Sequence, residues 1–340
     1  MMRIVRILCP ASNLSKNERI LNIINNFSNW INTDEFKELI YIFGGHYLPQ
    51  YNTIDQICWL KEEFIDVWDY RKRQREALTK EGEAARWLLK NDNLIDKNRT
   101  IIYDAAKILG LIGNRNTIYS NADYILPLGG ARMSNLRRCE LANQQLQTLQ
   151  NHTKIVALSG MRPISDSERK GFIDTYAPNA TTEYDAICCG MKKAFKNIYG
   201  SEDELQENSN PNLSYAIKHF LIKGEQNYEA YALAAPSTDP SRRANSADCF
   251  KFFFQKFHVK KHSKIINCTS EIYCPYQQVR SLSFAIDYQV EFDTIGFPFY
   301  LNNVVFDENN QQLSEPVNYL QEMKATIDAM YDFIKHYSIK

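Results

Sequence analysis

The stretch Tyr124-Ile-Leu-Pro-Leu-Gly-Gly130 decides the fold of this chain. A short apolar run that ends at two glycines is typical of a buried β-strand followed by a turn. The same pattern recurs in Lys154-Ile-Val-Ala-Leu-Ser-Gly160, and further apolar runs at 228–235 and 264–268 end in polar residues. Helical periodicity separates the runs, over about 134–149 and 241–257. The alternation predicts an α/β fold, a parallel sheet with helices on both faces.

Residues 1–118 carry a different pattern, which predicts an all-α N-terminal domain. Helices are expected to start at Ser15, where Glu18 completes a capping box, at Asn32 or Thr33, at Thr53 and at Thr100. The third is expected to run to Leu89, with a break near Gly82. We therefore divide the chain into an all-helical domain, 1–118, and a Rossmann-like domain, 119–340, that ends in a helix over about 316–335.

Composition excludes several classes of protein. The 340 residues include 40 Lys and Arg and 40 Asp and Glu, so the net charge is zero and nucleic-acid binding through bulk charge is not expected. The apolar run Ile4–Cys9 is interrupted by Arg6 and stopped by Pro10, and no run approaches the roughly 18 apolar residues of a membrane span. The 8 cysteines form no C-x-x-C pair. We expect a cytoplasmic protein with no membrane or nucleic-acid partner.

Small, hydroxyl and arginine residues follow each predicted strand. In open α/β sheets, ligands bind beyond the carboxyl ends of the strands. Glycine lets backbone N–H groups approach a ligand, and arginine binds phosphate or carboxylate through two donors. We therefore predict a pocket for a small anionic or nucleotide-like ligand; the alternative is that these residues only form turns. The residues are Gly129, Gly130, Arg132, Ser159, Gly160, Arg162, Ser237, Arg242, Thr269, Ser270 and Tyr273.

From Ala122 to about residue 295 the chain resembles the YdcF/SanA/ElyC-like domain family. The resemblance rests on Leu128-Gly129-Gly130 with Arg138 and Ala142, on Ser159-Gly160, on Thr182–Ala186, on Ser237 with Arg242–Asn245, and on Thr269-Ser270. Tyr273 stands nearest the position of the family's histidine, and the position of its arginine falls on Tyr276 or Gln277.

The resemblance implies a Rossmann-like sheet and a pocket that includes Glu183 and Asn245 beside the strand-end residues. It also implies a nucleotide or an S-adenosylmethionine-type compound as ligand or cofactor. The loss of the histidine and of a threonine, replaced here by Arg242, puts shared catalysis in doubt.

Glu183 is the candidate acid or base, with Tyr273 as the second catalytic candidate. Glu183 is expected at a helix start, where a carboxylate also stabilises the helix dipole without any further role. Arg138, with its neighbour Arg137, either holds the loop after the first strand, contacts the ligand, or has a solvated or ion-paired role on a helix face. Arg242 is expected at a helix start, where a cation is unfavourable unless an anion is bound nearby.

Other motifs give no site. His258 and His262 have the i, i+4 spacing of a zinc pair but lack a third ligand and the general-base glutamate, so a loop is expected and no metal. Neither a P-loop nor G-x-G-x-x-G occurs.

Two functions are therefore weighed. The first is a small-molecule-binding enzyme, a transferase or hydrolase, with its pocket at the strand ends and the helical domain as a lid. The alternative is a catalytically degenerate domain that senses a ligand or binds a protein partner through the helical region, which carries Trp30, Trp59, Trp68 and Trp87.

Overall fold

The computed structural model describes residues 4–74, 89–150, 152–224, 228–298, 305–306 and 312–337. The N-terminal part is helical, as predicted. Its elements are α1 (Lys16–Ile31), α2 (Asp34–Ile42), α3 (Thr53–Trp59), the π-turn η1 (Leu60–Phe64), the 3-10 turn η2 (Ile65–Trp68), α4 (Tyr70–Arg73), α6 (Asn93–Lys97) and α7 (Arg99–Ile108).

The capping signals explain where the first two helices begin and end. Ser15 Oγ accepts from the backbone N–H of Glu18, whose carboxylate accepts from Ser15 N, so the predicted capping box is confirmed. The side chain of Thr33 caps α2, and Gly44 follows that helix with a φ of 83°, a left-handed conformation that favours glycine.

Two predicted boundaries in this region are wrong. The helix that starts at Thr53 ends at Trp59, because the backbone then widens into the π-turn η1 and tightens into the 3-10 turn η2. Thr100 lies inside α7, which begins one residue earlier at Arg99. The predicted continuation past Gly82 falls on residues 75–88, outside the described residues.

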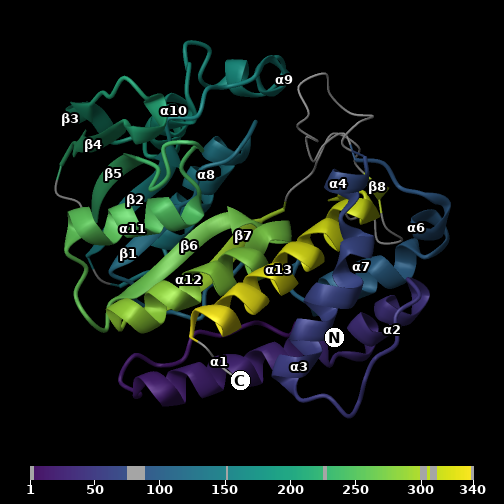
Figure 1. Cartoon of the computed structure of the whole chain (residues 1–340). Coiled ribbons are helices and arrows are strands. Elements are labelled where there is room, and N and C mark those ends of the chain that lie inside the picture. The colour runs from purple at the N-terminus through teal and green to yellow at the C-terminus, as the bar shows by residue number, and fades with distance from the viewer. Residues whose placement is uncertain are drawn as a thin grey trace.

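A seven-stranded sheet forms the rest of the molecule, in the order β3-β4-β5-β2-β1-β6-β7 (Figure 1). β1 is the middle one of the five parallel strands, and it pairs with β2 on one side and β6 on the other. β5 and β7 extend the parallel sheet outward. The strands are β1 (Tyr124–Pro127), β2 (Thr153–Gly160), β3 (Ile198–Gln206), β4 (Tyr215–Ile222), β5 (Tyr228–Ala235), β6 (Lys264–Ser270) and β7 (Glu291–Phe297).

Helices cover both faces of the sheet, which confirms the predicted fold class. Helices α8 (Ser134–Leu146) and α10 (Glu183–Ala194) share one core with side chains such as Ile125 of β1. Helices α11 (Ser246–Phe257) and α12 (Cys274–Tyr288) pack on the opposite face, against side chains such as Leu126. Successive strand residues point to opposite faces, so Ile125 and Leu126 serve different cores.

The antiparallel pair β3 and β4 adds an edge that the sequence analysis did not predict. Shorter elements complete the chain: α9 (Asp166–Arg169), η4 (Ile173–Thr175), η5 (Pro211–Leu213), η6 (Glu271–Tyr273), β8 (Val305–Phe306) and β9 (Gln312–Leu313).

The apolar core of the N-terminal helices continues into the C-terminal ones. Trp30 and Trp68 are fully buried in one cluster with side chains of α12 and of the last helix, α13 (Pro316–His336), which lies beside the N-terminal helices in Figure 1. The buried guanidinium of Arg19 in α1 donates to the carbonyls of Ala285 (2.7 Å) and Val290 (2.5 Å) at the end of α12. These contacts join the two regions; the boundary at 118 stays a prediction.

Candidate functional site at the carboxyl end of the sheet

Two glycines follow the central strand β1, and both are crowded. A Cβ atom on Gly129 would overlap Oε1 of Glu183 and lie 2.9 Å from the carbonyl oxygen of Leu158. A Cβ atom on Gly130 would lie 2.9 Å from Nη1 of Arg138. Glycine is therefore needed at both positions, because the predicted site residue Glu183 packs against Gly129 and Arg138 packs against Gly130.

Arg138 ties the ends of two neighbouring strands together. It is buried, and it donates to the carbonyl of Leu128 (2.8 Å), to that of Gly129, and to Ser270 Oγ (3.3 Å) at the end of β6. Its guanidinium lies 5.8 Å from the ring centroid of Tyr273. The fold thus brings Gly129, Gly130, Arg138, Ser270 and Tyr273 to one place.

Arg162 lies between two carboxylates. Its Nη1 and Nη2 donate to Glu168 at 2.7 and 2.8 Å, and its Nε donates to Oε2 of Glu183 at 3.1 Å. Burial alone would lower the pKa of Arg162, but its bonds and charge pairing with both carboxylates raise that pKa above its ordinary value. Burial likewise opposes ionisation of Glu168, yet Arg162 and Ser165 lower the pKa of its carboxyl.

Glu183 is the first residue of α10, as predicted. Its backbone N–H donates to the carbonyl of Arg162 (2.8 Å), and Thr182 and Asp185 form the capping box of the helix. The cap therefore comes from other residues, and the Glu183 side chain is left to reach Arg162 and Gly129.

Arg132 lies in the loop between Gly130 and α8, with a φ of 54°. Its guanidinium stacks 4.3 Å from the ring centroid of Phe172, and its carbonyl accepts from Tyr176 Oη (2.9 Å). Burial lowers the pKa of Arg132 to about 10. The phenylalanine face and the tyrosine hydroxyl hold this loop in place.

The predicted residues after β5 form a cluster of their own. Asp248 accepts from Arg242 Nη1 (2.5 Å) and from the backbone N–H of Asn245 (2.8 Å), while Asn245 caps α11. The prediction that Arg242 lies at a helix start is wrong, because α11 begins only at Ser246. Ser237 accepts from the backbone N–H of Asp239 (3.2 Å), so this cluster is satisfied by its own chain.

The remaining candidates lie at the ends of β2 and β6. Ser159 donates to the carbonyl of Leu233 (2.8 Å), and Gly160 ends β2. Thr269 is fully buried, and within the described chain its Oγ1 has no hydrogen-bond partner. Gln277 is the fourth residue of α12, and no described group bonds to its buried Oε1.

Sequence reasoning missed Glu168, which is buried and holds Arg162 in place. Ser165-x-x-Glu168 has the pattern of a capping box, and the structure forms that box. The pattern could have placed Glu168 near Arg162, since only five residues separate them. The capping pattern could not reveal that the Glu168 carboxylate also forms an ion pair with Arg162.

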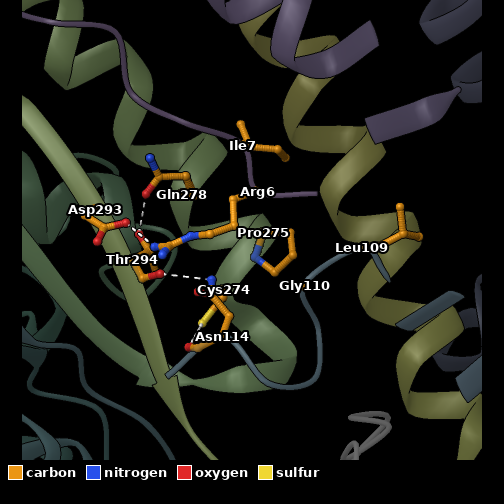
Figure 2. Close-up of a pocket in the computed structure, with 10 residues that line it drawn as sticks. All are labelled: Arg6, Ile7, Leu109, Gly110, Asn114, Cys274, Pro275, Gln278, Asp293 and Thr294. Carbon is orange, nitrogen blue, oxygen red and sulfur yellow. Dashed lines mark hydrogen bonds and ion pairs between the residues drawn. The ribbon is translucent and has the colours of Figure 1, made fainter. Parts of the chain in front are cut away.

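A small cavity lies elsewhere, between the N-terminal segment, α12 and β7 (Figure 2). Arg6 reaches across it to pair with Asp293, and Thr294 donates to Oε1 of Gln278 (2.6 Å). It has room for about one water molecule. None of the predicted site residues lines it.

His258 and His262 lie in the loop between α11 and β6, both with positive φ, and not on a helix. Within the described ranges, no group of His, Cys, Asp and Glu side chains is arranged to hold a metal ion. No helix of the described chain has both the length and the apolarity to cross a membrane.

Comparison with known proteins corrects the family resemblance. A sequence profile described as "Rv3785 N-terminal domain" matches residues 15–110. Uncharacterized protein Rv3785 of Mycobacterium tuberculosis is 26% identical over 338 residues, which cover 95% of this chain and 93% of the relative. Uncharacterized protein Mb3814 of Mycobacterium bovis matches to the same extent. No solved structure matches.

The similarity to these relatives spans nearly the whole chain and includes the helical region that the predicted resemblance left out. No match to the YdcF/SanA/ElyC-like family accompanies it, so that assignment was wrong. The motifs behind it, Leu-Gly-Gly, Ser-Gly and Thr-Ser, are short turn sequences at strand ends, which any parallel sheet of this kind requires.

Proposed function

We propose that this chain binds a small polar molecule at the carboxyl ends of β1, β2 and β6, and that it is an enzyme of transferase or hydrolase type. Nucleotides and S-adenosyl compounds are the first ligands to test. Doubly wound sheets bind ligands where neighbouring crossovers leave in opposite directions. The end of β1 is such a position. The crossover that follows β1 leads to β2 on one side, and the crossover that follows β6 leads to β7 on the other side.

One observation carries the proposal. Glu183, a largely buried carboxylate with 15% of its side chain accessible, lies over the glycine that follows β1, and Arg162 fixes it there. A carboxylate held in place by a buried ion pair, at the edge where such folds bind ligands, is suited to accept or deliver a proton.

The neighbours of Glu183 have supporting roles in this proposal. Arg138 holds the β1 and β6 ends at a fixed spacing, and the Tyr273 ring stands beside its guanidinium. Arg162 and Arg242, expected to neutralise an anionic ligand, already donate to carboxylates of their own chain. Their role in the proposal is therefore to position groups and not to bind the ligand directly.

The alternative, a partner-binding module that acts through the helical region, gains no support from the tryptophans. Trp30 and Trp68 are fully buried against this chain's own helices. Trp59 is half-buried against Phe64, and Trp87 lies outside the described residues.

Native mass spectrometry of the purified protein tests the proposal. We expect an excess mass that disappears when the same sample is denatured, and that is lost from Glu183→Asp, which withdraws the carboxylate from Gly129. Glu202→Gln is the matched control, since Glu202 is an exposed carboxylate on the edge strand β3. An excess mass of equal amount in wild type and Glu183→Asp would contradict the proposal.

A further inference from the structure

We infer that Glu183 receives a hydrogen-bond donor of the ligand, a hydroxyl or an amine, and that no phosphate or carboxylate group binds at this position. The inference rests on the proposed function and names the chemical class of the group recognised there. It reverses the expectation of an anion at this end of the sheet, and it follows from how the two oxygens of one carboxylate are used.

The two oxygens of Glu183 are in different situations. Oε2 accepts from Arg162 Nε at 3.1 Å. Oε1 lies over Gly129, and no donor in the described part of the chain bonds to it. The side chain keeps 15% of its surface accessible, so Oε1 stays within reach of a small molecule. The open position of the site is therefore an acceptor.

A carboxylate has no proton to donate and can only accept hydrogen bonds. A phosphate or carboxylate at Oε1 would bring two acceptors with negative charge together, which is unfavourable in a partly dehydrated site. A hydroxyl or an ammonium group supplies the donor that is needed. A ribose diol or an amino group has this chemistry, and an isolated phosphate does not.

The arginine that is bound to Glu183 already has its donors occupied by groups of this chain. Arg162 donates to Glu183, to both oxygens of Glu168, and to the carbonyl of Pro163 (3.3 Å). Arg162, Glu168 and Glu183 together carry a net charge of −1, because two carboxylates surround one guanidinium. Arg132, which Glu168 also attracts, is held against Phe172.

Glycine at position 129 makes room for Oε1. A Cβ atom there would overlap that oxygen, so Gly129→Ala would displace Oε1 from the position in which it meets the donor group. This substitution also brings the Cβ within 2.9 Å of the backbone oxygen of Leu158, which cannot move as freely as a side chain. Glu183→Asp is the second variant, because it withdraws the oxygen and leaves the backbone unchanged.

Ligand-detected NMR with matched probes tests the inference. The probes are adenosine, 2′,3′-dideoxyadenosine, adenosine monophosphate, ribose, ethanolamine and inorganic phosphate. We expect the wild type to bind at least one probe with a free diol or amine. Either the dideoxy analogue should bind the wild type at least tenfold more weakly, or Glu183→Asp should bind the probe at least tenfold more weakly. Glu202→Gln should bind the probe as the wild type does. Inorganic phosphate should not compete.

Two results would overturn the inference, and they can be told apart. Binding of adenosine monophosphate or phosphate that is equal in wild type and Glu183→Asp would refute the donor class and leave a ligand site in place. No response to any probe would refute the inference together with the proposed function.

Discussion

Replacing Arg162 with methionine should destabilise the fold by about 3 kcal/mol at neutral pH. The substitution removes the guanidinium that pairs with Glu168, whose side chain is only 2% exposed. Removal of one partner of a buried ion pair costs about 3–5 kcal/mol, because the other charge stays buried without compensation. Ser165 still donates to Glu168 through its backbone N–H (3.0 Å) and its hydroxyl (2.8 Å), which places the cost at the lower end.

The pH dependence identifies the cause. In the wild type the pKa of the Glu168 carboxyl is lowered, so its contribution to stability is present above the unfolded-state pKa and is lost as the pH falls through the folded-state value. In Arg162→Met burial acts without the arginine and raises the pKa of Glu168. Protonation then relieves the buried charge, and the deficit relative to wild type should shrink between pH 7.5 and pH 4.5.

Urea unfolding followed by circular dichroism measures both effects. The double variant Arg162→Met with Glu168→Gln should recover most of the loss, because position 168 then carries no buried charge. Arg137→Met is the matched control, an exposed pair with Glu140 that should cost less than about 1 kcal/mol. A loss below about 1 kcal/mol in Arg162→Met, or a loss independent of pH, would refute the reasoning.

Three further predictions concern stability. Arg19→Met should lower the free energy of unfolding by about 3 kcal/mol in urea unfolding, because its buried guanidinium satisfies carbonyls at the end of α12. Gly296→Ala should abolish soluble expression, since a Cβ there would overlap backbone atoms of Glu271, which cannot shift like a side chain. Asp248→Asn should make the free energy of unfolding depend less on pH in acid. Arg242 and Thr238 outweigh burial and lower the pKa of Asp248 to about 2. The stabilisation by this carboxylate is therefore present above pH 4 and is lost as the pH falls toward 2.

Each of these has a control within the chain. Asn17→Ala, exposed in the same helix as Arg19, should leave stability within about 0.5 kcal/mol. Gly160→Ala should be tolerated, because its Cβ would meet only Ala244 at 3.5 Å. Equal losses at the two glycines, or acid-unfolding profiles of wild type and Asp248→Asn that stay parallel down to pH 2, would count against these predictions.

Sequence patterns predicted the fold correctly where the signal lies within one short segment of the chain. The run at 228–235 coincides with β5, and Ser15 and Glu18 form the expected capping box of α1. Both signals are local: an apolar run between turns, and a capping residue before a helix. The edge strand β3 was missed because most of its residues are exposed, so it has no apolar run. Helix α11 was started too early, at Ser241, since the capping box of Asn245 and Asp248 was overlooked.

The candidate site was predicted less completely, because its geometry depends on pairs distant in sequence. The end of β1 could be placed from Gly129 and Gly130 alone. Two contacts depend on how the loop after β2 folds back. They are the ion pair of Glu168 with Arg162 and the position of Glu183 over Gly129. Residue type suggested free arginines for an anion, and only the structure shows that Arg162 and Arg242 pair with carboxylates.

A crystal structure of the protein grown with a ligand found by the NMR probes tests the central claim most directly. Our account predicts electron density for that ligand at the carboxyl end of β1, with a hydroxyl or amine within hydrogen-bond distance of Oε1 of Glu183. Density for the ligand elsewhere, with Oε1 of Glu183 covered by a side chain of this chain, would contradict it.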